Sequence, residues 1–184
     1  MIEHYYENIG ENWFTYDDLY KSMIEKYGNN SHFIEVGCWL GRSTCYMGVE
    51  IANSNYNIKF DGVDTWEGSI EHQGLEEIKN GTLYDEFLKN IEPIKHIVNP
   101  IRMTSIEASK IYEDNSLDFV FIDASHEYKD VLDDITHWLP KVKSGGCIAG
   151  HDYEYYEVNN AVNEFFKHKN FVILGNNCWL YNNH

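Results

Sequence analysis

Acidic residues, glycines and histidines lie at points of the sequence where an apolar run ends. These points are Glu35-Val36-Gly37-Cys38-Trp39-Leu40-Gly41, Asp64, Asp123 and His151-Asp152. Gly37 and Gly41 would let the backbone turn tightly and approach a bound molecule. Asp64 is suited to accept hydrogen bonds from the two hydroxyls of a ribose. Because ligands of a doubly wound sheet bind outside the carboxyl ends of its strands, we expect these residues to form one site.

The segments between these points alternate between two patterns. Short apolar runs predict strands, and segments with apolar residues every three to four positions predict amphipathic helices. The expected strands are 32–37, 58–64, 97–101, 117–123, 146–150, 171–174 and 178–181, and the expected helices are 15–27, 43–53, 83–91, 106–112, 131–139 and 158–166. The run 117–123 does not alternate, as expected where helices cover both faces of a parallel sheet. This order predicts a doubly wound α/β sheet, and Gly175-Asn176-Asn177 predicts a closing hairpin that adds one antiparallel strand.

Length and composition limit the class of protein. The 184 residues fit one compact domain, 1–184, in which an N-terminal helical and aromatic segment, 1–31, precedes a core, 32–184. No apolar run is long enough to span a membrane, so we expect no membrane partner and a cytoplasmic location. The formal net charge of −16 opposes binding to a polyanion, which argues against nucleic acid as a partner. The cysteines have no zinc-like spacing and are expected to be reduced thiols in or near the core: Cys38, Cys45, Cys147 and Cys178.

The order of the motifs resembles that of class I S-adenosylmethionine-dependent methyltransferases. An E-x-G-x-x-x-G turn precedes an acidic residue that closes the next strand, and Asp118-Phe119-Val120-Phe121-Ile122-Asp123 follows later. The resemblance covers residues 32 to 181. It implies a Rossmann-like, doubly wound sheet of seven strands, mostly parallel with the last strand antiparallel and with helices on both faces. It also implies S-adenosylmethionine as the methyl donor, bound above the first two strands.

The resemblance is closer to the branch called methyltransferase family 24. It rests on the stretches Val63 to Gly68, Phe121 to Tyr128, Trp138-Leu139-Pro140, Lys143 to Gly146 and Gly150 to Tyr153. Sugar O-methyltransferases of the macrocin and mycinamicin type are related to that branch. Much of the chain from Met1 to Asp64 also looks like methyltransferases encoded by marine phages. The resemblance implies a small-molecule or glycan acceptor, and the host cytoplasm as location if the chain is phage-encoded.

The resemblance also implies which residues hold the donor. Glu35 and Gly37 would contact its methionine end with help from Ser43. Asp64 would bind the ribose hydroxyls, Trp66 would pack beside the adenosine, and Ser105 would line the adenine. The full set of expected donor-binding residues is Glu35, Gly37, Cys38, Trp39, Gly41, Ser43, Asp64, Thr65, Trp66, Ser105 and Asp123. Ser43 and Ser105 have an alternative interpretation as caps of the helices that follow them.

In the related metal-dependent sugar enzymes, an Asp and a later acidic pair hold Mg²⁺, and a His three residues after the Asp acts as the base. This implies Asp123 and His126 as catalytic residues, with His126 the general base. Asp123, Asp152 and His151 would hold Mg²⁺ or another divalent cation. O-methylation benefits from a base near neutral pKa, because a hydroxyl reacts poorly until its proton is leaving. His151 argues against tight metal binding, since Mg²⁺ prefers oxygen ligands. His126 can alternatively be an exposed residue that starts the next helix.

Two other functions fit parts of the pattern. A nicotinamide-dependent oxidoreductase also uses a glycine turn and an acidic residue, but its G-x-G-x-x-G turn seats a pyrophosphate, whereas here Trp39 lies between Gly37 and Gly41. A non-catalytic S-adenosylmethionine-binding module would keep the fold without the reaction.

The long connection from Thr65 to Asn80, with His72, is a candidate lid over the acceptor. The sequence leaves open whether the protein forms a homodimer.

Overall fold

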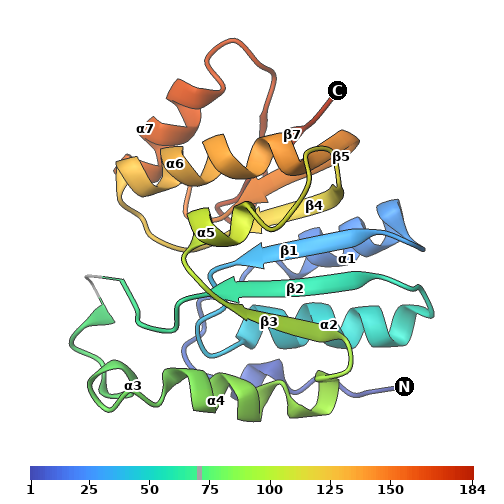
Figure 1. Ribbon diagram of the computed structural model, residues 1–184, viewed down its shortest axis with the longest axis vertical. Coiled ribbons are helices and arrows are strands. Elements are labelled where there is room, and N and C mark those ends of the chain that lie inside the picture. Colours follow the sequence, from blue (N-terminus) through green and yellow to red (C-terminus); the bar gives the residue numbers. More distant parts are fainter. Residues whose placement is uncertain (70–71) are drawn as a thin grey trace.

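The computed structural model describes residues 1–69 and 72–184, and a seven-stranded sheet forms its centre (Figure 1). The strand order is β3-β2-β1-β4-β5-β7-β6. The bounds are β1 His32–Val36, β2 Lys59–Asp64, β3 Val98–Arg102, β4 Leu117–Ile122, β5 Val142–Gly150, β6 Val172–Ile173 and β7 Trp179–Asn182. β1 to β5 pair in parallel, and β7 is antiparallel to both β5 and β6. The predicted doubly wound α/β sheet with an antiparallel last strand is confirmed.

Helices cover both faces of this sheet, as predicted (Figure 1). One face carries α1 (Asp17–Tyr27), α2 (Arg42–Ser54) and α4 (Leu83–Asn90), and the other carries α5 (Ser105–Ser109), α6 (Tyr128–Trp138) and α7 (Tyr156–Phe165). Short turns of helix connect the larger elements: η1 (Tyr6–Asn8), α3 (Glu76–Lys79), η3 (Glu92–Ile94) and η4 (Leu139–Lys141). Phe119 packs in the core on the first face and Val120 in the core on the second. The apolar run of β4 is therefore explained by burial on both sides of the sheet.

The strand and helix boundaries differ from the predicted ones in a few places. β5 begins at Val142, four residues before the predicted start, because Val142 already pairs with Leu117 of β4. β6 has only two residues, Val172 and Ile173, whose exposed fractions of 50% and 57% fit a strand at the edge of the sheet.

The connection from Thr65 to Asn80 contains α3, which the sequence pattern did not predict. Ile70 and Glu71 of this connection lie outside the described residues. In Figure 1 the connection projects from the edge of the molecule toward which the arrowheads of β1 and β2 point. It is therefore next to the carboxyl ends of the strands, where the site was expected.

The part of the N-terminal segment that precedes α1, residues 1–16, packs along α2 and also reaches these strand ends. Near its start, the side chain of Asn53 exchanges hydrogen bonds with the backbone of Ile2. Arg42, the first residue of α2, donates to the carbonyl oxygens of Ile9 and Gly10. Tyr16 then donates a 2.7 Å hydrogen bond to Oδ2 of Asp123. The N-terminal segment is thus joined to one of the predicted site residues.

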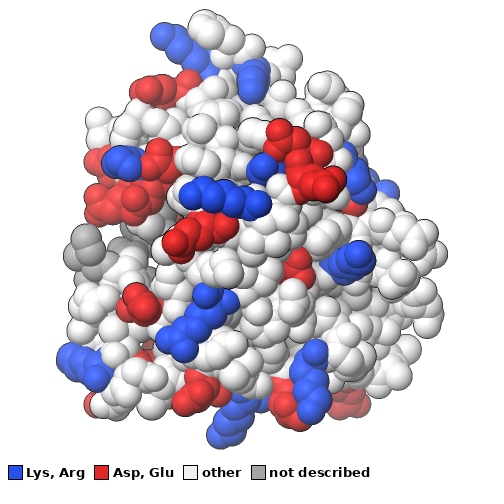
Figure 2. Space-filling view, in the orientation of Figure 1, with Lys and Arg blue, Asp and Glu red and all other residues white. Residues whose placement is uncertain are grey.

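On the face drawn in Figure 2, Lys and Arg side chains are scattered among Asp and Glu instead of gathering into one patch. Among the described residues, no helix is both long and apolar enough to cross a bilayer. Cys38, Cys45, Cys147 and Cys178 are free and buried, as predicted.

Candidate active site

A cavity of about 1170 Å³ lies at the carboxyl ends of the strands. Its wall is formed by the residues that follow β1, β2, β3, β4 and β5, together with part of the N-terminal segment. Most of the predicted site residues line it: Gly37, Cys38, Trp39, Ser43, Asp64, Thr65, Ser105, Asp123, His126, His151 and Asp152. The structure therefore brings together residues that are more than one hundred positions apart in the sequence.

The turn after β1 lies against the end of β4. Gly37 has a φ of +90°, and a Cβ atom at this position would lie 1.8 Å from the carbonyl oxygen of Asp123. The amide of Gly37 donates to the carbonyl of Val63, and the amide of Asp123 donates to the carbonyl of Val36. Only glycine fits at position 37, because both the dihedral angle and the space exclude a side chain.

The Asp64 carboxylate holds the turn in place. Oδ2 accepts hydrogen bonds from the backbone amides of Cys38 and Trp39, at 2.8 and 2.9 Å, and Oδ1 accepts one from the amide of Trp66 at 2.7 Å. A carboxylate has about four lone-pair positions, so it retains capacity for a further donor. Asp64 can therefore position the turn and also bind a hydroxyl group in the cavity.

Glu35, Gly41 and Trp66 are not among the residues that line the cavity. Gly41 precedes α2 with a φ of +87°, and its α-carbon faces the ring of Phe87. The Trp66 ring is buried against Phe87, and its Nε1 donates to the carbonyl of Trp39. These three residues therefore lie behind the turn and outside the cavity wall, and their predicted contacts with the donor stay predictions.

Glu35 is buried beneath the turn. Tyr20 donates a 2.8 Å hydrogen bond to its Oε1, and Thr44 donates to its Oε2. Burial raises the pKa of Glu35 from 4.5 to about 7, although the hydrogen bonds from Ser43, Thr44 and Tyr20 oppose this. Glu35 is therefore a buried acid whose two carboxyl oxygens accept hydrogen bonds from other side chains of the protein.

Ser105 lines the cavity, but its hydroxyl is bonded to protein groups. It donates to Oδ1 of Asp134 and accepts a 2.8 Å hydrogen bond from Nε1 of Trp138. Thr104, one position earlier, is the residue that caps α5, since its side chain accepts from the amide of Glu107. The alternative interpretation of Ser105 as the helix cap is therefore wrong.

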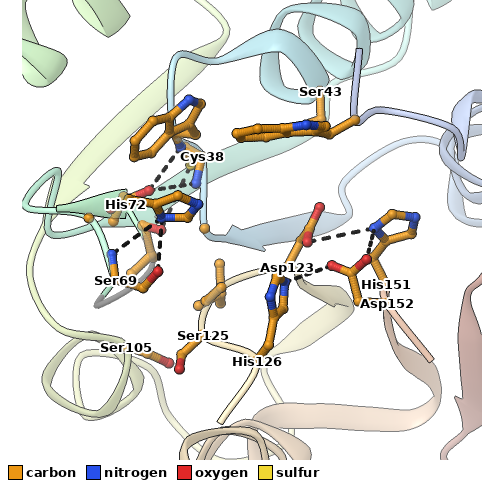
Figure 3. Close-up of a pocket in the computed structure, with 18 of the residues that line it drawn as sticks. Cys38, Ser43, Ser69, His72, Ser105, Asp123, Ser125, His126, His151 and Asp152 are labelled. Atoms are coloured by element: carbon orange, nitrogen blue, oxygen red, sulfur yellow. Dashed lines mark hydrogen bonds and ion pairs between the residues drawn. The ribbon is translucent and has the colours of Figure 1, made fainter. Parts of the chain in front are cut away.

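Four side chains after β4 and β5 point toward one another: Asp123, His126, His151 and Asp152 (Figure 3). Nε2 of His126 lies 2.8 Å from Oδ2 of Asp152. Nδ1 of His151 lies 3.2 Å from Oδ1 of Asp152 and 3.8 Å from Oδ1 of Asp123. We call these four residues the Asp–His cluster.

The pKa values of the two acids in the Asp–His cluster are shifted in opposite directions. Burial raises the pKa of Asp123 to about 6, even though the positive charge on His151 and the hydrogen bond from Tyr16 lower it. Burial also disfavours the ionised form of Asp152, but hydrogen bonds from His126 and His151 outweigh this and hold its pKa well below its usual range. Asp152 is thus the fixed negative charge to which both histidines bind.

Three side chains of the Asp–His cluster could together bind a divalent cation. Asp123, His126 and Asp152 each place one ligand atom within 4.8 Å of the others. Two carboxylates can hold Mg²⁺ together with waters, and an imidazole nitrogen in the set also suits Mn²⁺, Fe²⁺ or Zn²⁺. In this candidate set His126 stands where the sequence led us to expect His151. His151 instead faces Asp152 through Nδ1 and Thr15 through Nε2.

Two aromatic side chains of the cavity wall, Trp13 and Tyr155, were not among the predicted site residues. Trp13 lies over His72, with ring centroids 6.0 Å apart, and His72 lies 4.5 Å from the ring of Trp39. Tyr155 stacks on His126 at 4.8 Å with an interplanar angle of 16°. The cluster of aromatic residues near the N-terminus was a signal for Trp13, whereas no spacing in the sequence pointed to Tyr155.

Residues 34–153 match the model of a protein family described as a methyltransferase domain. The chain belongs to this methyltransferase family. An uncharacterized protein of Sinorhizobium fredii (strain NBRC 101917 / NGR234), y4gI, is 30% identical over 126 residues. That alignment covers 67% of this chain and 13% of the relative, so the chain spans a small part of that protein's length.

Solved methyltransferases share the fold of this methyltransferase domain. The O-methyltransferase NovP superposes with a TM-score of 0.66 at 15% identity, covering 91% of this chain and 78% of NovP. CalS11, a calicheamicin methyltransferase, gives a TM-score of 0.66 at 11% identity, covering 90% of this chain and 76% of CalS11. The expected methyltransferase domain is confirmed by the family match, and its fold is that of these solved methyltransferases.

Two ends can be distinguished in the cavity of the methyltransferase domain. One end contains the turn after β1, Asp64 and Ser105, and we call it the donor end. The other contains the Asp–His cluster and Tyr155, which stacks on His126, and we call it the acceptor end. Asp123 lies between them, because its backbone contacts Gly37 and its side chain belongs to the cluster.

Proposed function

We propose that this domain transfers a methyl group from S-adenosylmethionine to a hydroxyl oxygen of a sugar or another small acceptor. One observation carries the proposal: a single cavity joins the turn and the Asp64 carboxylate to a cluster that contains a histidine paired with a carboxylate. The related fold of CalS11, described as a TDP-rhamnose 3'-O-methyltransferase in its apo form, supports a sugar as acceptor.

At the donor end, we propose that Asp64 binds the ribose hydroxyls, since its carboxylate lines the cavity and retains acceptor capacity. The backbone of Gly37, Cys38 and Trp39 would contact the rest of the donor, with Ser43 and Thr65 beside it. Asp123 would lie near the reacting atoms. Glu35, Gly41 and Trp66 would shape this end from behind.

S-adenosylmethionine supplies an electrophilic methyl group on a sulfonium sulfur. Transfer would form a bond from the acceptor oxygen to the methyl carbon as the bond from carbon to sulfur breaks, and the electron pair would remain on sulfur. The hydroxyl proton would pass to the imidazole of His126. Asp152, 2.8 Å from Nε2, stabilises the imidazolium that forms, and alignment of the reacting atoms supplies much of the acceleration.

A divalent cation at Asp123, His126 and Asp152 is the alternative form of this mechanism. A bound cation would stabilise the developing alkoxide, but His126 would then be a ligand and could not accept the proton. The two forms make opposite predictions for a chelator. Base catalysis by His126 predicts that activity survives treatment with a chelator, whereas cation assistance predicts that it is lost and that Mg²⁺ or Mn²⁺ restores it.

The test of the proposed function is calorimetry followed by turnover. S-adenosylmethionine and S-adenosylhomocysteine are titrated into the protein, and a panel of glycosides and small phenols is then screened by mass spectrometry for an added methyl group. Saturable binding of both ligands with methylation of a hydroxyl supports the proposal. No binding of either ligand would sink it. Binding without turnover of any hydroxylated acceptor would favour the non-catalytic module.

A further inference from the structure

A buried acid of α6, Asp134, faces the cavity and takes no part in the proposed mechanism. It lies on the same side of the helix as the buried residues Val131, Ile135 and Trp138, and its exposed fraction is only 5%. It nevertheless lines the cavity. An ionised carboxylate is costly to bury unless hydrogen bonds or charges compensate it. The partners of its two oxygens therefore indicate what Asp134 can do.

One carboxyl oxygen of Asp134 is bonded within the protein, and the other is not. Ser105 donates its hydroxyl proton to Oδ1. Among the described residues, no group donates to Oδ2. The neighbouring Asp133 also lines the cavity, but its carboxylate pairs with Lys129 at 2.5 Å. Oδ2 of Asp134 is therefore a buried acceptor that a molecule in the cavity can use.

Trp138 fixes the direction of this hydrogen-bond chain. Its indole N–H can only donate, and it donates to Oγ of Ser105 at 2.8 Å. Ser105 directs its single proton to Asp134, so one lone pair of Oγ and the whole of Oδ2 remain as acceptors. We call these two residues the Ser105–Asp134 pair. With Asp134 ionised, the pair offers acceptors to the cavity and no donor.

The Ser105–Asp134 pair and the Asp–His cluster lie on opposite sides of Asp64. β3, which precedes Ser105, is next to β2 at one end of the strand order, and the amide of Met103 donates to the carbonyl of Asp64 at 3.1 Å. The Asp–His cluster follows β4 and β5, on the other side of β1. In the proposed function Asp64 holds the ribose and the methyl group faces the cluster. The base of the donor therefore extends toward the pair.

Apolar side chains next to the pair suit the faces of a flat base. Met103, Ile106 and Ala124 line the cavity together with it. The edge of adenine carries an exocyclic amino group, which donates hydrogen bonds. Two acceptors among apolar side chains match that amino group. An oxygen at the same position of the base would instead meet the lone pairs of both protein groups.

We infer that Asp134, together with Ser105, binds the 6-amino group of the donor's adenine and makes the site selective against bases with an oxygen at that position. The inference rests on the proposed function, because the donor must occupy this end of the cavity. It assigns the amino group a hydrogen bond to Oδ2, so that both carboxyl oxygens of Asp134 have a donor when the cofactor is bound. Asp134 is then a specificity-determining residue.

The first experiment measures this selectivity in the unaltered protein. S-adenosylhomocysteine carries an amino group at position 6 of the purine, and S-inosylhomocysteine carries an oxygen. Both are titrated by calorimetry at pH 8, because burial raises the pKa of Asp134 to about 7. We expect S-adenosylhomocysteine to bind about 30-fold more tightly or better, since the oxygen leaves a buried carboxylate without a donor.

The outcomes of this titration separate the inference from the proposed function. Equal affinities for the two ligands would overturn the inference and leave the proposed function standing. Binding of neither ligand would sink the proposed function and the inference with it.

The second experiment exchanges Oδ2 of Asp134 for a donor. In Asp134→Asn the side-chain oxygen can keep the hydrogen bond from Ser105, which turns the amide NH₂ toward the cavity. We expect the preference for S-adenosylhomocysteine to fall to about threefold or less, or to reverse. Asp133→Asn is the matched control, because it removes the same charge one position away, and it should change the preference by less than about twofold. Full preference in Asp134→Asn, or an equal loss in both variants, would contradict the inference.

The ratio of the two affinities separates recognition from structural damage. A variant that only distorts this end weakens both ligands alike and keeps the ratio, whereas lost recognition weakens S-adenosylhomocysteine alone. If urea unfolding shows that Asp134→Asn does not fold, Ser105→Ala takes its place. It removes the other acceptor and should lower the preference by about three- to tenfold. An unchanged ratio in Ser105→Ala would then overturn the inference.

Discussion

Replacing Glu35 with Gln tests whether this residue is a donor ligand or a buried support. Its carboxyl group is enclosed by Tyr20, Thr44 and the turn after β1, and burial raises its pKa to about 7. The folded protein therefore binds this proton more tightly than the unfolded chain does. The stability that this proton contributes is fully present below pH 4.5 and is lost as the pH rises through about 7.

The size of the effect follows from the two pKa values. A rise from 4.5 to about 7, at about 1.4 kcal/mol for each pH unit, corresponds to about 3 kcal/mol of unfolding free energy between acid and mildly alkaline solution. Gln resembles the protonated acid and does not ionise. We therefore expect Glu35→Gln to be close to the unaltered protein in stability near pH 5 and more stable at pH 8, by up to about 3 kcal/mol.

Urea unfolding at several pH values between 5 and 8 measures this difference. Glu25→Gln, on the exposed side of α1, is the matched control and should leave the pH dependence unchanged. Parallel curves for Glu35→Gln and the unaltered protein would refute the assignment of a raised pKa. The affinity for S-adenosylhomocysteine at pH 6 gives the second result. A loss of tenfold or more would show that Glu35 is a ligand, as the sequence suggested, and an unchanged affinity would show that it is a support.

Three further substitutions test the site. Asp64→Ala should weaken S-adenosylhomocysteine binding by about 1–3 kcal/mol in calorimetry, because charge-assisted hydrogen bonds are lost, and an unchanged affinity would remove Asp64 from the donor end. Gly37→Ala should lower the urea-measured unfolding free energy by about 3 kcal/mol or more, since its Cβ would overlap the Asp123 carbonyl; a loss below 1 kcal/mol would contradict this contact. His126→Asn should slow methyl transfer by about 10²–10⁴-fold and leave donor binding nearly intact, whereas full turnover would show that His126 is not the base.

The sequence predicted the sheet and its flanking helices because their signals are local. Apolar runs marked the central strands, and the run of β4 correctly indicated burial on both faces. Errors occurred where local signals compete with tertiary contacts. Val172 and Ile173 are apolar but lie exposed at the sheet edge, and β5 extends back to Val142 because Leu117 is there to pair with it.

The donor end could be predicted more fully than the acceptor end. The donor residues follow one strand each, so their position in the sequence indicates their position in the fold. The acceptor wall is assembled from Thr15, Tyr155 and Asn176, which come from the N-terminal segment, the start of α7 and the hairpin turn. Their meeting depends on how these elements pack, and no spacing in the sequence records it. The acceptor wall could therefore not be predicted from the sequence.

The backbone contacts around Gly37 determine which parts of the site can be altered independently. The amide of Gly37 donates to the carbonyl of Val63 at the end of β2, and Gly37 lies against the backbone of Asp123 after β4, so the donor turn and Asp123 are in direct backbone contact. Substitutions at these backbone contacts should change donor binding and catalysis together. His126 and Tyr155 lie outside these contacts, on the segments that follow β4 and β5, and stack on each other. They are the positions at which the proposed acceptor chemistry can be altered with donor binding intact.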